Sequence, residues 1–132
     1  MPMDHHSAYT ACLQLASRFY LSLDSSDTPG LLACVTENTV WHRQGQALQG
    51  REAISQALAA RNAARITCHQ ISNFDLQAET DSEAVANYYV TVYDNQGPQG
   101  ALQLKTIMRS QDRFQRMDGQ WTLLSKRSSK HL

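Results

Sequence analysis

The chain has 132 residues, of which 42% are hydrophobic and 18% charged, a composition that is typical of one globular domain and excludes a disordered chain. Lys and Arg together number 12, as do Asp and Glu, so the net charge is zero and gives no long-range attraction for nucleic acid. No apolar run approaches the ~18 residues of a membrane helix, and the first residues lack the apolar core of a signal peptide. We therefore expect a cytoplasmic protein without nucleic-acid or membrane partners.

The first half of the chain predicts helices and one strand. Apolar residues at spacings of three and four form a stripe along a first helix, and Asp24 lies on the margin of that stripe near the helix end. Thr28 and Pro29 suit the cap and first turn of a second, short helix. A strand over 39–42 follows, and a third helix begins after Gly50.

The second half predicts strands only, because Val, Ile and Tyr are frequent in runs separated by polar turns. The expected strands are residues 66–76, 84–93, 101–117 and 120–127, with a loop over 95–100. Asp118-Gly119 is a preferred two-residue hairpin turn, and it places Phe114 opposite Leu123. Residues 1–132 form one expected domain, with 1–6 and 128–132 as flexible tails.

Helices that precede a run of strands indicate an α+β fold. We expect three N-terminal helices packed into a strongly curved antiparallel sheet of four to six strands. Such a sheet leaves a concave face that the helices do not fill, which predicts a cone with one apolar pocket. Large residues occupy both faces of the strand over 84–93, so we also expect a homodimer through the sheet.

Cysteine content and motifs narrow the possible chemistry. The three cysteines are odd in number and have apolar neighbours, so Cys12, Cys34 and Cys68 are interpreted as reduced core residues. The sequence contains no glycine-rich phosphate loop and none of the sequences GxSxG, CxxC or HExxH. We therefore expect no metal and no cofactor.

Two polar residues lie where the pattern favours apolar ones. Asp24 borders the helical stripe, and His69 lies in a strand whose alternation puts Ile71 and Asn73 on the same face. A carboxylate orients an imidazole, and the imidazole then removes a proton from a substrate. Both residues also have ordinary structural interpretations, Asp24 as a turn residue and His69 as a hydrogen-bonded strand residue.

Six segments carry a family resemblance through their order and spacing: 23–27, 40–42, 49–54, 67–73, 88–89 and 116–121. They resemble the SnoaL-like branch of the nuclear-transport-factor-like superfamily, whose members have a cystatin-like α+β cone. Two enzymes of that superfamily, scytalone dehydratase and hexachlorocyclohexane dehydrochlorinase, use an Asp at the end of the first helix and a His on the strand after the third helix. The resemblance implies that His69 is a general base and that Asp24 is its orienting carboxylate.

The same resemblance implies a cofactor-free lyase or isomerase: a dehydratase, dehydrohalogenase, isomerase or cyclase that acts on a small apolar or aromatic ring compound. The expected substrate-binding residues are Tyr20, Trp41, His42, Asn73 and Tyr88. His42 and Ser110 stand near a tyrosine and an asparagine of the dehydratase, so the same substrate is not implied. The alternative is a non-catalytic small-ligand-binding protein or a structural subunit of an aromatic-ring oxygenase.

Overall fold

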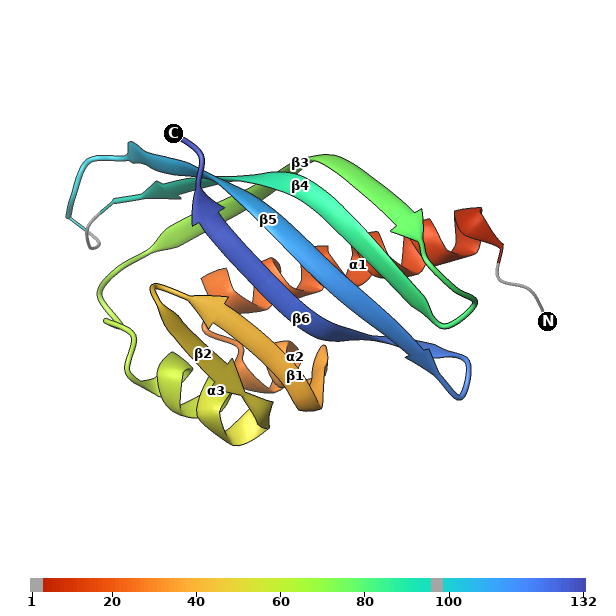
Figure 1. Ribbon diagram of the computed structural model, residues 1–132. Helices are drawn as coiled ribbons and strands as arrows, with labels where there is room; N and C mark the ends of the chain where they lie inside the picture. The colour runs from red at the N-terminus through yellow and green to blue at the C-terminus, as the bar shows by residue number, and fades with distance from the viewer. Residues whose placement is uncertain (1–3, 96–98) are drawn as a thin grey trace.

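The computed structural model describes residues 4–95 and 99–132, so parts of the expected 1–6 tail and 95–100 loop lie outside the described residues. In chain order the elements are α1 (His5–Asp24), α2 (Thr28–Leu32), β1 (Val35–Arg43), β2 (Gln46–Gln49), α3 (Gly50–Ala59), β3 (Thr67–Ala78), β4 (Glu83–Asp94), β5 (Gln103–Met117) and β6 (Gln120–Lys130). The expected α+β class and the helices preceding the main run of strands are confirmed (Figure 1).

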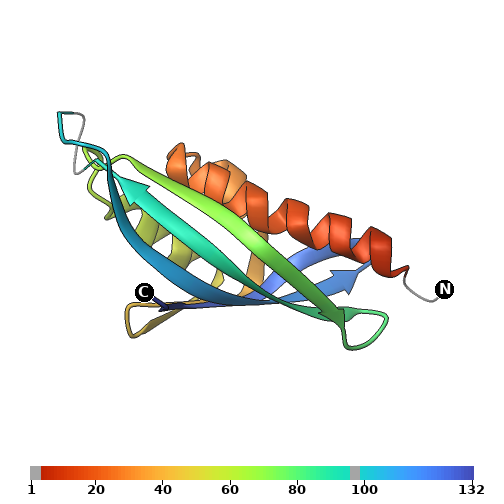
Figure 2. The ribbon, with the colours of Figure 1, turned by 90° about the horizontal axis from the view of Figure 1, so that it is seen from above.

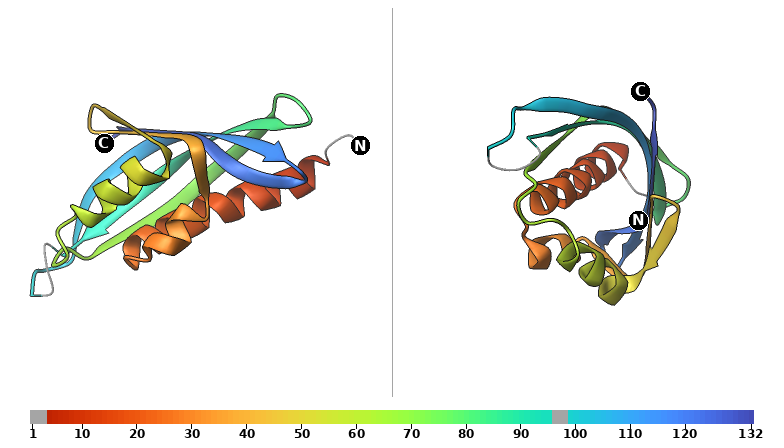
Figure 3. Two further views of the ribbon diagram at one scale, coloured as in Figure 1. Left: turned by 90° about the horizontal axis from the view of Figure 1, so that it is seen from below. Right: turned by 90° about the vertical axis from the view of Figure 1, so that its left-hand side faces the viewer.

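The strands form one six-stranded sheet in the order β2-β1-β6-β5-β4-β3. All neighbours are antiparallel except β1 and β6, which run parallel, so the expectation of a wholly antiparallel sheet is wrong at this pair. β2 was not predicted; it is a short strand that folds back on β1. The sheet curls around α1, while α2 and α3 lie across the side that the curl leaves uncovered (Figure 3).

α1 forms because its apolar residues repeat on one face and its first turn is capped. The Asp4 side chain accepts hydrogen bonds from the backbone N–H groups of His6 and Ser7. The helix therefore begins inside the stretch expected to be a tail. α1 runs alongside β3 (Figure 2). The short α2 is capped by Asp27, which accepts from Gly30 N–H, and not by the expected Thr28.

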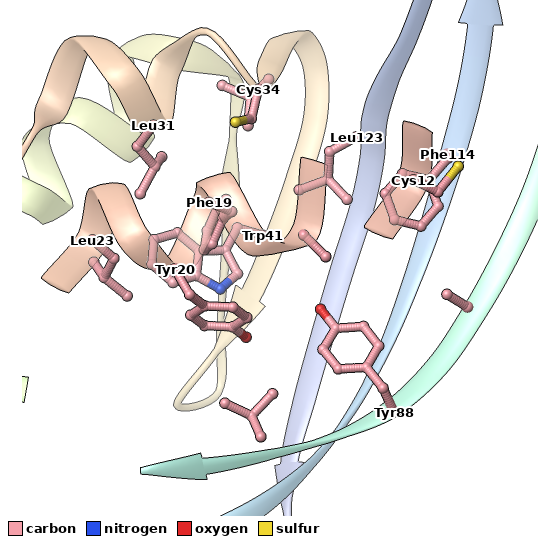
Figure 4. Close-up of a cluster of buried hydrophobic side chains, with 14 of the residues drawn as sticks. Cys12, Phe19, Tyr20, Leu23, Leu31, Cys34, Trp41, Tyr88, Phe114 and Leu123 are labelled. Carbon is pink, nitrogen blue, oxygen red and sulfur yellow. The ribbon is translucent and has the colours of Figure 1, made fainter. Parts of the chain in front are cut away.

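The core lies between α1 and the concave face of the sheet. Phe19 on α1 packs edge-on against Trp41 on β1, with ring centroids 5.0 Å apart (Figure 4). Cys12 and Cys34 are buried as expected, whereas Cys68 is exposed. Cys68 was misplaced because neighbouring strand residues point to opposite faces, and His69 takes the inward position.

The hairpin between β5 and β6 has the predicted turn and register. Asp118 and Gly119 both have positive φ angles, 53° and 79°, as this tight turn requires. Phe114 lies opposite Leu123, but the register then shifts, so that Lys126 pairs with Asp112. β6 continues to Lys130, beyond the residue at which the tail was expected to begin. Among the described helices, none is long and apolar enough to span a membrane.

Candidate active site

Asp24 and His69 meet where the end of α1 lies against the start of β3. An Asp24 carboxylate oxygen, Oδ1, lies 2.6 Å from His69 Nδ1, and Oδ2 accepts the His69 backbone N–H at 2.8 Å. Thr67 Oγ1 donates a third hydrogen bond to Oδ1 at 2.8 Å. Because an ionised carboxylate only accepts hydrogen bonds, Nδ1 is the donor, and a neutral ring then carries its lone pair on Nε2.

Local contacts explain why Asp24 is ionised although it lies at the C-terminal end of α1. A negative charge at the C-terminal end of a helix is opposed by the helix dipole. Arg61 offsets this by donating to the Leu23 carbonyl at 2.9 Å and to Thr67 Oγ1 at 3.3 Å. Burial acts to raise the pKa of Asp24, but the hydrogen bonds from His69 and Thr67 outweigh it and hold that pKa below its ordinary value.

Tyr20 fixes the imidazole from a second direction. It lies one turn before Asp24 on α1, and its ring stacks on the His69 ring with centroids 5.0 Å apart and planes inclined by 18°. The stacking and the bond to Asp24 together restrain the position and tilt of the ring. The side chains of His69 and Asp24 are 9% and 16% exposed, so the pair lies at the edge of the core.

A cavity of about 640 Å³ opens beside His69. It lies at the end of the cone where α1 and β4 end and where β3 and β5 begin, the end that faces the viewer on the right of Figure 3. Its apolar wall comprises Tyr20, Leu23, Trp41, Val92 and Met108. Its remaining lining is polar and basic, so the expectation of an apolar pocket holds for only part of the wall.

Comparison with known proteins gives the family. The SnoaL-like domain matches residues 4–127. The chain belongs to the SnoaL-like family. The resemblance inferred from the order of the sequence motifs is therefore confirmed over nearly the whole chain.

Solved structures similar to this SnoaL-like protein share its fold. A protein of unknown function with a cystatin-like fold from Nostoc punctiforme has a TM-score of 0.84 and 22% identity over 98% of this chain and 95% of its own. A hexachlorocyclohexane dehydrochlorinase (LinA, type 2) has a TM-score of 0.87 and 16% identity over 98% and 88%. A putative scytalone dehydratase from Novosphingobium aromaticivorans has a TM-score of 0.77 and 17% identity over 93% and 83%. No curated protein matches the sequence.

Of the substrate-binding residues predicted for the SnoaL-like protein, two line the cavity and three do not. Tyr20 and Trp41 belong to its wall. His42 follows Trp41 on β1 and points to the other face of the sheet, where its ring lies 3.5 Å from the Arg127 guanidinium. Asn73 is exposed, because β3 has a register shift between Ser72 and Asp75 and Asn73 takes a positive φ of 55°.

Tyr88, the third of these, is not among the residues that line the cavity and lies in a closed polar cluster. Its hydroxyl donates to Asp112 at 2.6 Å and accepts from Lys126 Nζ at 2.7 Å. Lys126 also donates to both carboxylate oxygens of Asp112, at 2.8 and 3.1 Å. Both charged side chains are fully buried. The close-up in Figure 4 shows Tyr88 pointing from β4 towards Tyr20 on α1.

The electrostatics of this cluster are those of a buried ion pair. Burial lowers the pKa of Lys126, but the adjacent Asp112 charge outweighs it and the pKa lies above its ordinary value. Burial and the same carboxylate raise the pKa of Tyr88 well above its usual range. Lys126 Nζ lies 4.6 Å from the Tyr20 ring centroid, so Tyr20 contacts the cluster as well as His69. Neither Asp112 nor Lys126 was predicted as a site residue from the sequence.

Basic side chains at the cavity were also missed. Arg43 lies two residues after Trp41 on β1, and strand alternation alone would have placed it on the same side. Arg61 and Arg65 follow α3 in a segment that has no periodic pattern, so no sequence signal pointed to them. Within residues 4–95 and 99–132, no three His, Cys, Asp or Glu side chains gather as a metal site.

Proposed function

We propose that this SnoaL-like protein is a cofactor-free lyase or isomerase in which His69 removes a proton from a ring compound. The observation that carries the proposal is the 2.6 Å contact between His69 Nδ1 and Asp24 at the wall of an open cavity. His69 Nε2 makes no hydrogen bond with any described residue, so its lone pair is left for a substrate. A plugged interior would have favoured the binding-protein alternative.

The chemistry follows from the two nitrogens of one ring. Nε2 takes a proton from a carbon of the substrate. In a lyase the electron pair of that C–H bond forms a double bond as a halide or hydroxide leaves the neighbouring carbon with the electrons of its own bond. In an isomerase the electron pair moves into an adjacent double bond or carbonyl of the substrate, and the proton returns at another carbon. Asp24 accepts the hydrogen bond from Nδ1 throughout, which orients the ring and stabilises the imidazolium that forms.

The names of similar structures agree with this reaction type. One is a dehydrochlorinase and another a putative dehydratase. Both names describe the loss of a small group from a carbon skeleton. In the SnoaL-like protein, Tyr20 and Trp41 offer flat aromatic surfaces beside His69, which suits a cyclic substrate.

A generic proton-abstraction probe tests the base without knowledge of the substrate. Nitrobenzisoxazole is a small ring compound that opens when a base removes one carbon-bound proton, and the phenolate product is followed by its absorbance. We expect the wild-type protein to accelerate this opening and His69→Ala to lower the rate by about 10²–10⁴-fold. His42→Ala is the matched control, because this histidine lies on the other face of the sheet, and it should keep the wild-type rate.

Two outcomes would overturn the proposal. One is a wild-type protein no faster than His69→Ala, and the other is an equal loss of rate in His42→Ala. Either result would favour a protein that binds a ring compound without transforming it.

A further inference from the structure

The cavity beside His69 has a strongly positive lining. Five of its side chains are cationic and come from β1, the segment after α3, β5 and β6: Arg43, Arg61, Arg65, Lys105 and Lys130. No Asp or Glu is among the described residues that line it. The chain as a whole has no net charge, so the fold concentrates positive charge at this one opening.

Only part of this charge is neutralised by the protein itself. Asp94, which is buried, lies 3.2 Å from Arg65 and 3.8 Å from Lys105. Arg43 makes no ion pair with a described residue; its guanidinium lies over the Trp41 ring, 4.8 Å from the centroid. Arg61 donates to the uncharged oxygens of Leu23 and Thr67. Two guanidinium groups are thus held at the cavity without an ion-pair partner among the described side chains.

The guanidinium groups are close enough to disfavour one another's charge. Burial, followed by the charge of Arg65, lowers the pKa of Arg43. Burial, followed by Arg65 and Arg43, lowers the pKa of Arg61, and the charge of Asp24 offsets only part of this. Cations that repel one another at the mouth of a cavity are stabilised when an anion binds between them.

We propose that the substrate of this SnoaL-like protein is a ring compound that carries a carboxylate, bound at the cavity mouth by Arg43 with Arg61 and Arg65 nearby. A planar guanidinium matches a carboxylate in a paired hydrogen-bond geometry. The stacking on Trp41 holds Arg43 flat against the same wall that receives the ring. The ring then lies along Tyr20 and Trp41, within the cavity that His69 also lines.

The proposal refines the substrate class of the proposed enzyme, and it is tested by binding alone. The probes are naphthoate and its uncharged analogue naphthamide, which have the same rings, and binding is measured by isothermal titration calorimetry. We expect naphthoate to bind the wild-type protein at least about tenfold more tightly than naphthamide, because one hydrogen-bonded charge pair is worth about that factor. Arg43→Gln should remove this preference and leave naphthamide binding unchanged.

Two further variants make the result decisive. Lys130→Gln removes an exposed cation of the lining and should weaken naphthoate binding by about two- to fivefold even if Arg43→Gln fails to fold. Arg109→Gln is the charge-matched control: Arg109 follows Met108 on β5 and points to the opposite face, so naphthoate binding should not change. Equal binding of the two probes, or an equal effect of Arg109→Gln, would overturn the carboxylate proposal.

The two proposals fail separately. His69→Ala removes the proposed base but keeps Arg43, so it should still bind naphthoate more tightly than naphthamide. If naphthoate binding depends on Arg43 while no variant changes nitrobenzisoxazole opening, the anion site stands and the catalytic proposal is wrong. If His69→Ala abolishes the opening while naphthoate shows no preference, the base stands and the substrate class is wrong.

Discussion

At Asp24, burial and hydrogen bonding act on one carboxyl in opposite directions. Burial alone would favour the protonated form, but the two hydrogen bonds from His69 and the one from Thr67 favour the charged form and prevail. The stability of the fold and the orientation of the proposed base therefore depend on the same charge. A residue that only ended the helix would not accept three hydrogen bonds from one strand.

We predict that Asp24→Asn lowers the free energy of unfolding by about 1–2 kcal/mol at neutral pH, because charged hydrogen bonds are lost. The pKa of Asp24 is depressed in the folded state, so its contribution is present above the ordinary carboxyl pKa of 3.8 and is lost as the pH falls through the lower folded value. The difference in free energy of unfolding between Asp24→Asn and the wild type should therefore shrink as the pH falls below 3.8. Urea unfolding measured across the acid range checks this.

Asp118→Asn is the control for this series. Asp118 lies in the exposed hairpin turn, where Asn-Gly is as favourable as Asp-Gly, so its effect should be small at every pH. A difference for Asp24→Asn that grows as the pH falls would contradict the assigned direction.

Among the strands, the buried cluster of Tyr88, Asp112 and Lys126 joins β4, β5 and β6. An ion pair without solvent is stable only while both charges are present, because each alone bears its full desolvation cost. Lys126 of this cluster also packs against the Tyr20 ring. The cluster therefore helps to fix the position of Tyr20, the ring that stacks on His69.

We predict that Lys126→Met lowers the free energy of unfolding by about 3–5 kcal/mol, because it leaves the Asp112 carboxylate buried without its cation. The double variant Lys126→Met/Asp112→Asn removes both charges and keeps an acceptor for the Tyr88 hydroxyl, so it should recover a large part of that loss. Denaturant unfolding of both variants gives the comparison. A double variant less stable than Lys126→Met would show that the pair itself, and not the unpaired charge, sets the cost.

Most helices and strands could be predicted from the sequence, whereas this cluster could not. The stripe on α1, the turn at Asp118-Gly119 and the pairing of Phe114 with Leu123 follow from local periodicity and turn chemistry, and the structure has all three. The shift between Arg113 and Phe114 reverses the alternation that the turn had set, and it brings Lys126 inside. Nothing local in the sequence marks that shift.

The site was predicted in the same uneven way. Asp24 and His69 were identified because each stands in an apolar pattern, and they lie in contact. His42 and Asn73 were assigned to the pocket although strand alternation and a bulge direct them elsewhere. The bulge depends on how β3 meets β4, which is tertiary information.

At the scale of the whole molecule, exposed apolar side chains lie on and beside the outer face of the sheet. Tyr93 on β4 lies opposite Leu104 on β5, and Leu104 is 57% exposed. Neighbouring Leu102 is 78% exposed. We propose that two copies pack through this face, as expected from the large residues on both faces of β4, and a chain of zero net charge adds no repulsion between them.

We predict that the wild-type protein is a dimer by light scattering at micromolar concentration and that Leu104→Glu converts it to a monomer, because a charge would be buried in the interface. Leu21→Glu is the matched control, because Leu21 is 68% exposed on α1, away from the sheet, and should leave the mass unchanged. A monomeric wild type would contradict the dimer.

The parallel contact between β1 and β6 has a consequence for synthesis on the ribosome. β1 emerges early, yet its partner on one side is the strand that follows all the others in the sequence. Trp41 and Lys130, which border the same hollow, therefore come together only after translation of this last strand. The cavity is incomplete until that moment. A ligand of this cavity can therefore stabilise the completed fold, but it cannot assist the early stages of folding.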